Sequence, residues 1–433
     1  SIHYGCKVNQ YESNAMAQKF QEKGYEICEI EQKPDIVVVN TCTVTNIADR
    51  KSRQILRKVK EENQNSIIIA VGCYVQVAKE KVKEMSEIDL CLGNVEKKDI
   101  VSKVEKYIEE KEKIDIIDVN DEKEFQEMGL ITFSEKTRAT VKIQDGCNNF
   151  CTYCLIPYAR GRIRSRKKEN VIDEVTKIAE KGIKEIIITG IHIASYGKDF
   201  QNNYRLIDLL EDLDKIKGIQ RIRLGSLEPT IITEEFAKRL SKLNTICNQF
   251  HLSLQSGCDE TLKRMNRKYS CEEFERVTEI LRKYFKDVNL TTDIIVGFPG
   301  ETKKEFEKTY EFLERIKFYK MHIFKYSPRA GTIAAKMTNQ IDGNIKEERS
   351  QKLIELSNKN EKEYNEKYIG KEVEVLFEEK KNGLWSGYTK NYIKVYCESE
   401  ENLENKIINV VPLEPKEQNL FGTTIYSNDN GAK

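Results

Sequence analysis

Apolar runs alternate with charged amphipathic stretches in the first part of the chain. Two runs, 35–42 (DIVVVNTC) and 66–73 (SIIIAVGC), are rich in β-branched residues and end at turn residues. Each is followed by a charged segment with helical spacing of its apolar positions, 46–62 and 75–85. Strands that alternate with helices are typical of βαβ units. The pattern therefore predicts an α/β fold that begins with an open parallel sheet domain over residues 1–115.

A second alternation begins near Thr137, after an irregular acidic linker over 116–135. Six further apolar runs are mostly separated by helical stretches. Six such units predict a partial (β/α)6 barrel over 133–368, whose active site lies at the carboxyl ends of the strands. The predicted strands are 139–144, 185–189, 221–226, 249–255, 289–297 and 321–327.

The pattern changes again after a Lys- and Glu-rich helix predicted over 345–368. Four short segments with two-residue alternation follow, and no helical stretch separates them. They predict a small β-barrel of OB-like type over 369–430. The segments are 371–379, 384–391, 392–399 and 406–415.

The charge of the chain is almost balanced, with 72 Lys and Arg against 71 Asp and Glu. This balance excludes a polybasic protein and restricts any nucleic-acid contact to a local patch. No segment approaches the roughly 20 apolar residues of a membrane span. The opening, SIHYGCKVNQYESN, has no sustained apolar run. We therefore expect a soluble, cytoplasmic protein with no signal peptide and no membrane partner.

Twelve cysteines in such a chain indicate metal or redox chemistry rather than disulfides. The strongest motif is GCNNFCTYC, in which Cys147, Cys151 and Cys154 follow the first barrel strand. Three thiolates can bind three irons of a 4Fe–4S cubane and leave the fourth iron open to S-adenosylmethionine. A structural zinc site is the alternative. It requires four ligands, and no fourth Cys or His lies nearby in the sequence.

A second set of cysteines is dispersed along the first domain. Cys42 and Cys73 each follow an apolar run, and Cys6 follows an opening segment compatible with the tail of a strand. Such positions converge at the carboxyl edge of an open α/β sheet, so a second cluster site and three buried free cysteines are both compatible with the pattern. The other cysteines lack ligand spacing and are interpreted as packing or exposed thiols: Cys28, Cys91, Cys247, Cys258, Cys271 and Cys397. The four scattered histidines are predicted to have core or barrel-rim roles: His3, His192, His251 and His322.

The three-cysteine motif and the run 151–166 (CTYCLIPYARGRIRSR) resemble the methylthiotransferase branch of the radical-SAM superfamily. The resemblance covers essentially the whole chain, in the order cluster domain, radical-SAM core and carboxyl-terminal TRAM barrel, an RNA-binding module. It implies that the first cluster cleaves S-adenosylmethionine to a 5′-deoxyadenosyl radical. It also implies that Cys6, Cys42 and Cys73 bind an auxiliary 4Fe–4S cluster.

Within that family, GCKVNQYE resembles the type that acts on threonylcarbamoyladenosine. The resemblance implies addition of a methylthio group to C2 of this nucleoside at position 37 of tRNA, with flavodoxin or ferredoxin as a typical electron donor and no DNA partner. Three alternatives stay open. They are methylthiolation of isopentenyladenosine in tRNA or of a ribosomal protein side chain, a cobalamin-dependent radical methylase, and an iron–sulfur RNA-binding regulator without catalysis.

Several residues near predicted strand ends are candidates for contacts with S-adenosylmethionine. Glu228 is the candidate for a hydrogen bond to the ribose, and Gln255 for contact with the methionine part. Gly297 permits close approach of the backbone. Tyr153, by the resemblance, contacts the adenine through its backbone. Each of these residues is equally compatible with shaping a loop.

The densest basic run follows the cysteine loop and comprises Arg160, Arg162, Arg164, Arg166, Lys167 and Lys168. We interpret its arginines as an RNA-contacting surface, because a phosphate backbone has to be held near the reaction centre. The alternatives are a solvated face and, for Arg160 and Arg166, binding of the S-adenosylmethionine carboxylate or ordering of the loop. Aromatic residues of the terminal barrel either stack on RNA or fill the barrel: Trp385, Tyr388, Tyr392 and Tyr396.

Overall fold

The computed structural model describes residues 2–3, 5–111, 115–129 and 137–425. The predicted linker over 116–135 therefore lies partly outside the described residues, as does the end of the predicted terminal barrel domain, 426–430. Within the described ranges, no helix combines the length and the apolar character that crossing a membrane requires.

The first sheet has four parallel strands in the order β1-β2-β3-β4. Both faces of β2 and β3 are covered, one by α1 and α5 and the other by α2. This explains why these strands are apolar throughout, since strands buried on both faces have no polar side. Its elements are β1 Ile2–His3, α1 Lys7–Glu22, η1 Ile30–Gln32, β2 Ile36–Thr41, α2 Asn46–Glu62, β3 Ile67–Gly72, α3 Cys73–Val77, α4 Lys79–Lys83, β4 Leu90–Leu92, η2 Val95–Asp99 and α5 Ile100–Glu110.

The predicted open parallel sheet is thus confirmed, with differences in detail. The predicted segment 75–85 contains two short helices, α3 and α4, and the first of them begins at Cys73 itself. The three-residue strand β4 was not predicted. The two-residue strand β1 does precede Cys6, as the sequence suggested.

Six parallel strands form the central partial barrel, in the order β5-β7-β8-β9-β10-β11. Isolated parallel bridges, Ile222 to Ile246 and Leu227 to Leu252, join its two sheets between β8 and β9. The short strand β6 adds an antiparallel edge beside β5. The elements are β5 Arg138–Asp145, α6 Ile156–Arg160, β6 Arg164–Ser165, α7 Lys168–Glu180, β7 Glu185–Gly190, η3 Ile193–Ser195, α8 Leu206–Leu213, β8 Arg221–Leu224, η4 Pro229–Ile231, α9 Glu234–Leu240, β9 Gln249–Gln255, α10 Asp259–Arg264, α11 Cys271–Tyr284, β10 Asn289–Val296, α12 Lys303–Ile316, β11 Lys320–Lys325, η5 Ala334–Lys336 and α13 Gly343–Glu366.

The terminal strands close into a barrel in the order β12-β13-β14-β16-β15. Four of its strands match the predicted segments, and the fifth, β16, was not predicted. Trp385 lies in the apolar core of this barrel, so its indole fills the interior. The strands are β12 Val373–Lys381, β13 Leu384–Thr389, β14 Lys394–Cys397, β15 Ile407–Lys416 and β16 Asn419–Thr424.

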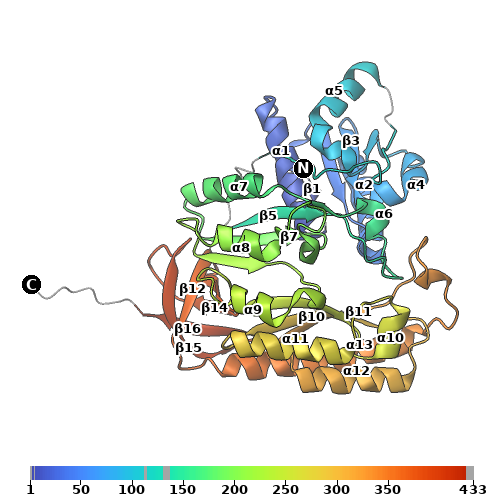
Figure 1. Ribbon diagram of the computed structural model, residues 1–433. Helices are drawn as coiled ribbons and strands as arrows, with labels where there is room; N and C mark the ends of the chain where they lie inside the picture. Colours follow the sequence, from blue (N-terminus) through green and yellow to red (C-terminus); the bar gives the residue numbers. More distant parts are fainter. Residues whose placement is uncertain (1, 4, 112–114, 130–136, 426–433) are drawn as a thin grey trace, which may run out of the picture.

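Figure 1 shows the first sheet and the terminal barrel on different sides of the central barrel, with α6 among the amino-terminal elements.

Arginines at the starts of the central strands form the contact with the terminal barrel. Arg221 donates to the Tyr388 carbonyl at 2.8 Å. The Arg138 guanidinium lies 4.9 and 5.5 Å from the ring centroids of Tyr388 and Tyr392, which stack on each other. These two tyrosines therefore pack against the central barrel.

Glu185 is the central acid of this contact. It is fully buried, and its carboxylate lies 2.9 Å from Arg223 and 3.9 Å from both Arg138 and Arg221.

Changing Glu185 to Gln should lower the free energy of unfolding by about 3 kcal/mol, because buried arginines lose their counter-charge. Urea denaturation measures this. Glu234→Gln, which breaks an exposed pair with Lys283, is the control and should leave the midpoint unchanged. Equal midpoints for the two variants would contradict the assignment.

Candidate metal centres

The first candidate centre is the loop that follows β5. Gly146 turns the chain at φ +73°, and a Cβ there would lie 1.8 Å from the Arg162 carbonyl oxygen, so only glycine fits. The Cys147 amide donates to the Gly161 carbonyl at 3.0 Å, and the Cys154 amide donates to the Cys151 carbonyl at 2.9 Å. The loop is therefore closed on itself and presents its three thiols together.

The surroundings of these thiols are suited to a metal cluster. Burial raises the pKa of Cys147 to about 11 and that of Cys154 to about 12, and neighbouring cysteines of the loop add to both shifts. Thiols of such high pKa become thiolates when a metal binds them. Backbone amides already point at the sulfurs, from Asn149 to Cys147 at 3.5 Å and from Ile156 to Cys154 at 3.4 Å. Three sulfurs with N–H donors fit a cubane cluster with one open iron.

Arg267, which the sequence analysis missed, connects this loop to the strand ends. Its Nη1 donates to the Cys151 sulfur at 3.2 Å, and its Nη2 donates to both carboxylate oxygens of Glu228 at 2.9 and 2.8 Å. His192 lies 3.7 Å from the same carboxylate and 3.1 Å from the Asn149 side chain. Burial acts to raise the pKa of Glu228, but His192 and Arg267 outweigh it and lower that pKa. The carboxylate is therefore ionised beside the cysteine loop.

The second candidate centre lies at the carboxyl edge of the first sheet. Cys42 follows β2, Cys73 follows β3, and Cys6 is the residue before α1. A Cβ on Gly5, which has φ +133°, would lie 2.9 Å from the Cys42 sulfur. Burial raises the pKa of Cys42 to about 11, with Cys73 and Cys6 contributing to the rise. The structure thus brings the three dispersed cysteines together, and they too offer three sulfurs to a metal cluster.

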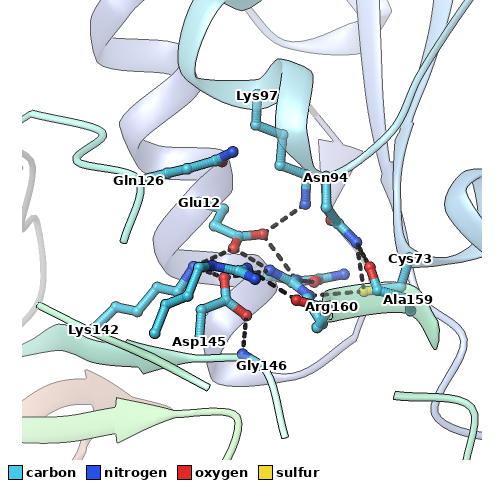
Figure 2. A network of polar contacts seen from close by, with 12 residues as sticks. Glu12, Cys73, Asn94, Lys97, Gln126, Lys142, Asp145, Gly146, Ala159 and Arg160 are labelled. Carbon is cyan, nitrogen blue, oxygen red and sulfur yellow. Dashed lines mark hydrogen bonds and ion pairs between the residues drawn. The ribbon is translucent and has the colours of Figure 1, made fainter. Parts of the chain in front are cut away.

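A buried network of charges joins the two domains next to this centre (Figure 2). Glu12 of α1 contacts Arg160 of α6, Lys97 at 2.6 Å and Lys142 of β5 at 2.7 Å. Lys142 also contacts Asp145 at 2.5 Å. Burial acts to raise the pKa of Glu12, but its three cationic neighbours hold that pKa well below its usual range. All five charged groups are buried.

Arg160 extends from this network to the second centre. Its Nε donates to the Cys73 sulfur at 3.1 Å, and its Nη2 donates to the Asn9 side chain at 3.0 Å. Asn94 fixes the same helix by donating to the Ala159 carbonyl at 2.7 Å, and its amide lies 3.6 Å from the Cys73 sulfur. The central domain therefore contributes a donor to the cysteine set of the first domain.

A second contact between the domains lies beside Cys42. Arg329, from the segment after β11, donates to the carbonyl and the hydroxyl of Thr43, both at 2.6 Å, and contacts Asp49 at 2.9 Å. The loop that carries Cys42 is thus bound directly to the central barrel.

The interpretation of the basic run as one RNA-contacting surface is wrong for three of its four arginines. Arg160, Arg164 and Arg166 are buried. Arg160 pairs with Glu12, Arg166 pairs with Glu174 and Glu127, and Arg164 donates to the carbonyls of Arg160 and Arg162. Acids from other segments pair with Arg160 and Arg166, and carbonyls of the same segment accept from Arg164. Arg162 alone of the four is exposed, with its guanidinium 4.5 Å from the centroid of the Phe150 ring.

The other predicted contacts occupy the same end of the barrel. The Tyr153 ring packs edge-on against Phe298, with centroids 6.2 Å apart. Gln255 ends β9 with φ +74°, and Gly297 follows β10 with φ +68°. The Lys346 side chain covers Gly297, because a Cβ at this glycine would lie 2.3 Å from the Lys346 Cγ.

One other group of side chains has the composition of a metal site. His251, Asp293 and His322 lie on adjacent strands β9, β10 and β11, with their potential ligand atoms within 4.8 Å of one another. His251 is hydrogen-bonded at both ring nitrogens, to Thr291 at 3.0 Å and to Asp293 at 3.1 Å. A hydrogen-bonded histidine–aspartate pair accounts for this geometry. Of the two histidines, His251 is partly buried and His322 is exposed.

Two family models match the chain. Residues 141–313 match the radical SAM superfamily, and residues 1–93 match an uncharacterised protein family, UPF0004. Each match contains one of the two cysteine sets.

Relatives match over nearly the full length. A threonylcarbamoyladenosine tRNA methylthiotransferase, MtaB, of Bacillus subtilis is 41% identical over 94% of this chain and 91% of its own length. A tRNA-2-methylthio-N(6)-dimethylallyladenosine synthase of a Thermoanaerobacter species is 37% identical over 98% of this chain and 91% of its own length. Among solved structures, the radical S-adenosylmethionine methyltransferase TsrM of Kitasatospora setae has a TM-score of 0.56 at 14% identity, over 75% of this chain and 71% of its own. This last likeness concerns the fold alone.

The burial of the basic run yields a stability test. Changing Arg166 to Ala should lower the free energy of unfolding by about 3 kcal/mol or more, because Glu174 is left buried without its partner. Changing Arg162 to Ala removes only an exposed contact with an aromatic ring and should cost less than about 1 kcal/mol. Urea denaturation of the two variants makes the comparison. Equal losses would contradict the separation into buried and exposed arginines.

Proposed function

We propose a function for this chain, which belongs to the radical-SAM methylthiotransferase family. It attaches a methylthio group to threonylcarbamoyladenosine in tRNA, at C2 of the nucleoside at position 37, next to the anticodon. The observation that carries the proposal is the pairing of two three-cysteine centres at the junction of two domains. Identity of 41% to a threonylcarbamoyladenosine tRNA methylthiotransferase over nearly the whole chain supports the choice of substrate.

The first centre holds the 4Fe–4S cluster that the radical SAM family implies, with S-adenosylmethionine as its partner. Cys147, Cys151 and Cys154 are its ligands. The second centre, Cys6, Cys42 and Cys73, holds an auxiliary 4Fe–4S cluster. When bound, the two clusters and S-adenosylmethionine supply the radical chemistry and the sulfur.

The residues of the chain orient and enclose these groups. Arg267 holds Glu228 and Cys151 in a fixed relation, so a carboxylate stands ready for the ribose hydroxyls of S-adenosylmethionine. Gln255 contacts its methionine part, Gly297 at the end of the adjacent strand permits close approach of the backbone, and Tyr153 contacts its adenine through the backbone. Arg329 and Arg160 hold the first domain against the barrel mouth, so that the substrate base lies between the two centres.

The terminal barrel is proposed to be a TRAM domain that binds tRNA. Tyr388 and Tyr392 pack against the central barrel, so RNA contact is left to other residues. Tyr396, beside Lys394 and Lys416, is one, and the exposed Arg162 next to the cysteine loop is another.

A small electron-transfer protein such as flavodoxin or ferredoxin supplies the electron. Twelve free cysteines support a reducing cytoplasm as the location.

The alternative substrates have less support. A relative named for dimethylallyladenosine is also similar, at 37% identity, below the 41% of the threonylcarbamoyladenosine enzyme. Methylthiolation of a ribosomal protein is not named for either of these relatives. A cobalamin-dependent methylase shares the fold at 14% identity, which carries no argument about activity.

The substrate is tested with defined tRNAs. Anaerobically reconstituted protein is supplied with S-adenosylmethionine, a reductant and tRNA carrying either threonylcarbamoyladenosine or isopentenyladenosine. Mass spectrometry of the nucleosides should find a methylthio group on the first nucleoside and at most a trace on the second. The reverse preference would replace the proposed substrate with the alternative and leave the reaction class intact.

The division of labour between the centres is tested by iron content and two activities. The protein should bind about eight irons, as expected for two 4Fe–4S clusters. Ala at Cys6, Cys42 and Cys73 together should remove half of this iron, preserve reductive cleavage of S-adenosylmethionine and abolish the methylthio product. Ala at Cys147, Cys151 and Cys154 should remove the other half of the iron and both activities. A folded first variant that no longer cleaves S-adenosylmethionine would contradict these roles.

A further inference from the structure

Arg160 belongs to one centre by its position in the chain and to the other by its contacts. It lies in α6, directly after the loop of Cys147, Cys151 and Cys154. Its Nε nevertheless donates to the sulfur of Cys73, in the set of the other domain, at 3.1 Å. Only 1% of this side chain is exposed, so water does not compete for the contact.

The other end of the guanidinium is fixed in two directions. Its Nη2 donates to Glu12 and to the Asn9 side-chain oxygen, each at 3.0 Å, and its Nη1 pairs with Glu12 and with Asp145. A planar fork held at both ends has little freedom to rotate. The Nε–H is therefore aimed at Cys73 by the network in Figure 2 and not by the cysteine alone.

The network carries an excess of positive charge. It contains three cations, Arg160, Lys97 and Lys142, against two carboxylates, Glu12 and Asp145, all buried. A buried excess charge is costly without a counter-charge nearby. As a metal ligand, the Cys73 sulfur is a thiolate, and its negative charge can balance the excess positive charge of the network.

Hydrogen bonds to cluster sulfurs and the net charge around a cluster set its reduction potential. A donor on a thiolate and a buried cation both stabilise the more negative, reduced form. Arg160 supplies both to the same sulfur. Arg267 has the matching contact in the first centre, with Cys151 at 3.2 Å.

We propose that Arg160 is a positioning residue which the central domain contributes to the auxiliary centre, where its Nε–H orients Cys73 and raises the reduction potential of the bound cluster. The proposal rests on the auxiliary cluster of the proposed function. The residue acts on the cluster through its contact with Cys73.

The test uses the full chain with Ala at Cys147, Cys151 and Cys154, so that the auxiliary cluster alone is observed. Arg160→Lys keeps the charge opposite Glu12 and loses the fork that aims Nε at sulfur. Redox titration followed by electron paramagnetic resonance should show a potential lower by about 59 mV, a tenfold change in a one-electron equilibrium. Arg160→Gln, which also loses the charge, should lower it further or release the cluster.

Two controls separate this effect from general disturbance. Arg166→Gln removes another buried arginine that pairs with Glu174 and contacts no cysteine, and it should leave the potential unchanged. Arg267→Lys, in a chain with Ala at Cys6, Cys42 and Cys73, should shift the potential of the first cluster instead.

The outcomes separate a failure of the proposed auxiliary cluster from a failure of the proposed role of Arg160. If the parent variant binds no iron at Cys6, Cys42 and Cys73, the auxiliary cluster of the proposed function is wrong. If the parent binds the cluster and Arg160→Lys has the same potential and the same iron content, the role of Arg160 is overturned. A shift in Arg166→Gln equal to that in Arg160→Lys would also overturn it, because the effect would then be general.

Discussion

The buried ion network between α1, α6 and β5 is the constraint on which the rest of this structure depends. Glu12, Arg160 and Lys142 are each costly to remove from water, and the pairs that Glu12 makes with Arg160 and Lys142 form only when the first domain is docked on the central barrel. Separating the domains would break these two pairs and expose the groups to water again. The two domains are therefore coupled by electrostatics next to the cysteine set of the first domain.

This coupling supports the proposal that a loop and a sheet edge contribute to one reaction centre. The loop after β5 supplies three thiols and then, through α6, the arginine that reaches Cys73. Arg329 binds the Cys42 side of the first domain to the segment after β11. These two contacts, one at Cys73 and one next to Cys42, fix the second cysteine set relative to the central barrel. The chemistry proposed here requires such a fixed relation, because a radical formed at one centre has to reach a base held near the other.

The buried arginines also show why charge along a sequence is a weak guide to a surface. Arg160 ends helix α6, Arg164 lies in strand β6, and Arg166 follows that strand. Unlike Arg162, which lies between them and is exposed, these three are buried. They contact Glu12, Glu174 and backbone carbonyls, so the positive charge is consumed inside the protein. Tyr388 and Tyr392 are likewise used inside the protein, because the Arg138 guanidinium lies over both of their rings. Arginines and tyrosines that suit RNA recognition by type serve here in internal contacts, and Arg160, Tyr388 and Tyr392 join domains.

The sequence by itself determined the elements whose signals are local. The apolar strands β2, β3, β5, β7, β9 and β10 were predictable within about a residue, because burial on their faces requires continuous apolar or alternating runs. The C-x-x-x-C-x-x-C spacing likewise specifies a three-thiolate site within one loop. Short strands such as β4 and β16 have no such signal, since their pairing partners determine them. Only the tertiary structure decided that Arg160 meets Glu12 and Cys73, or that Arg267 meets Glu228, because those contacts join segments whose approach depends on domain docking and barrel closure.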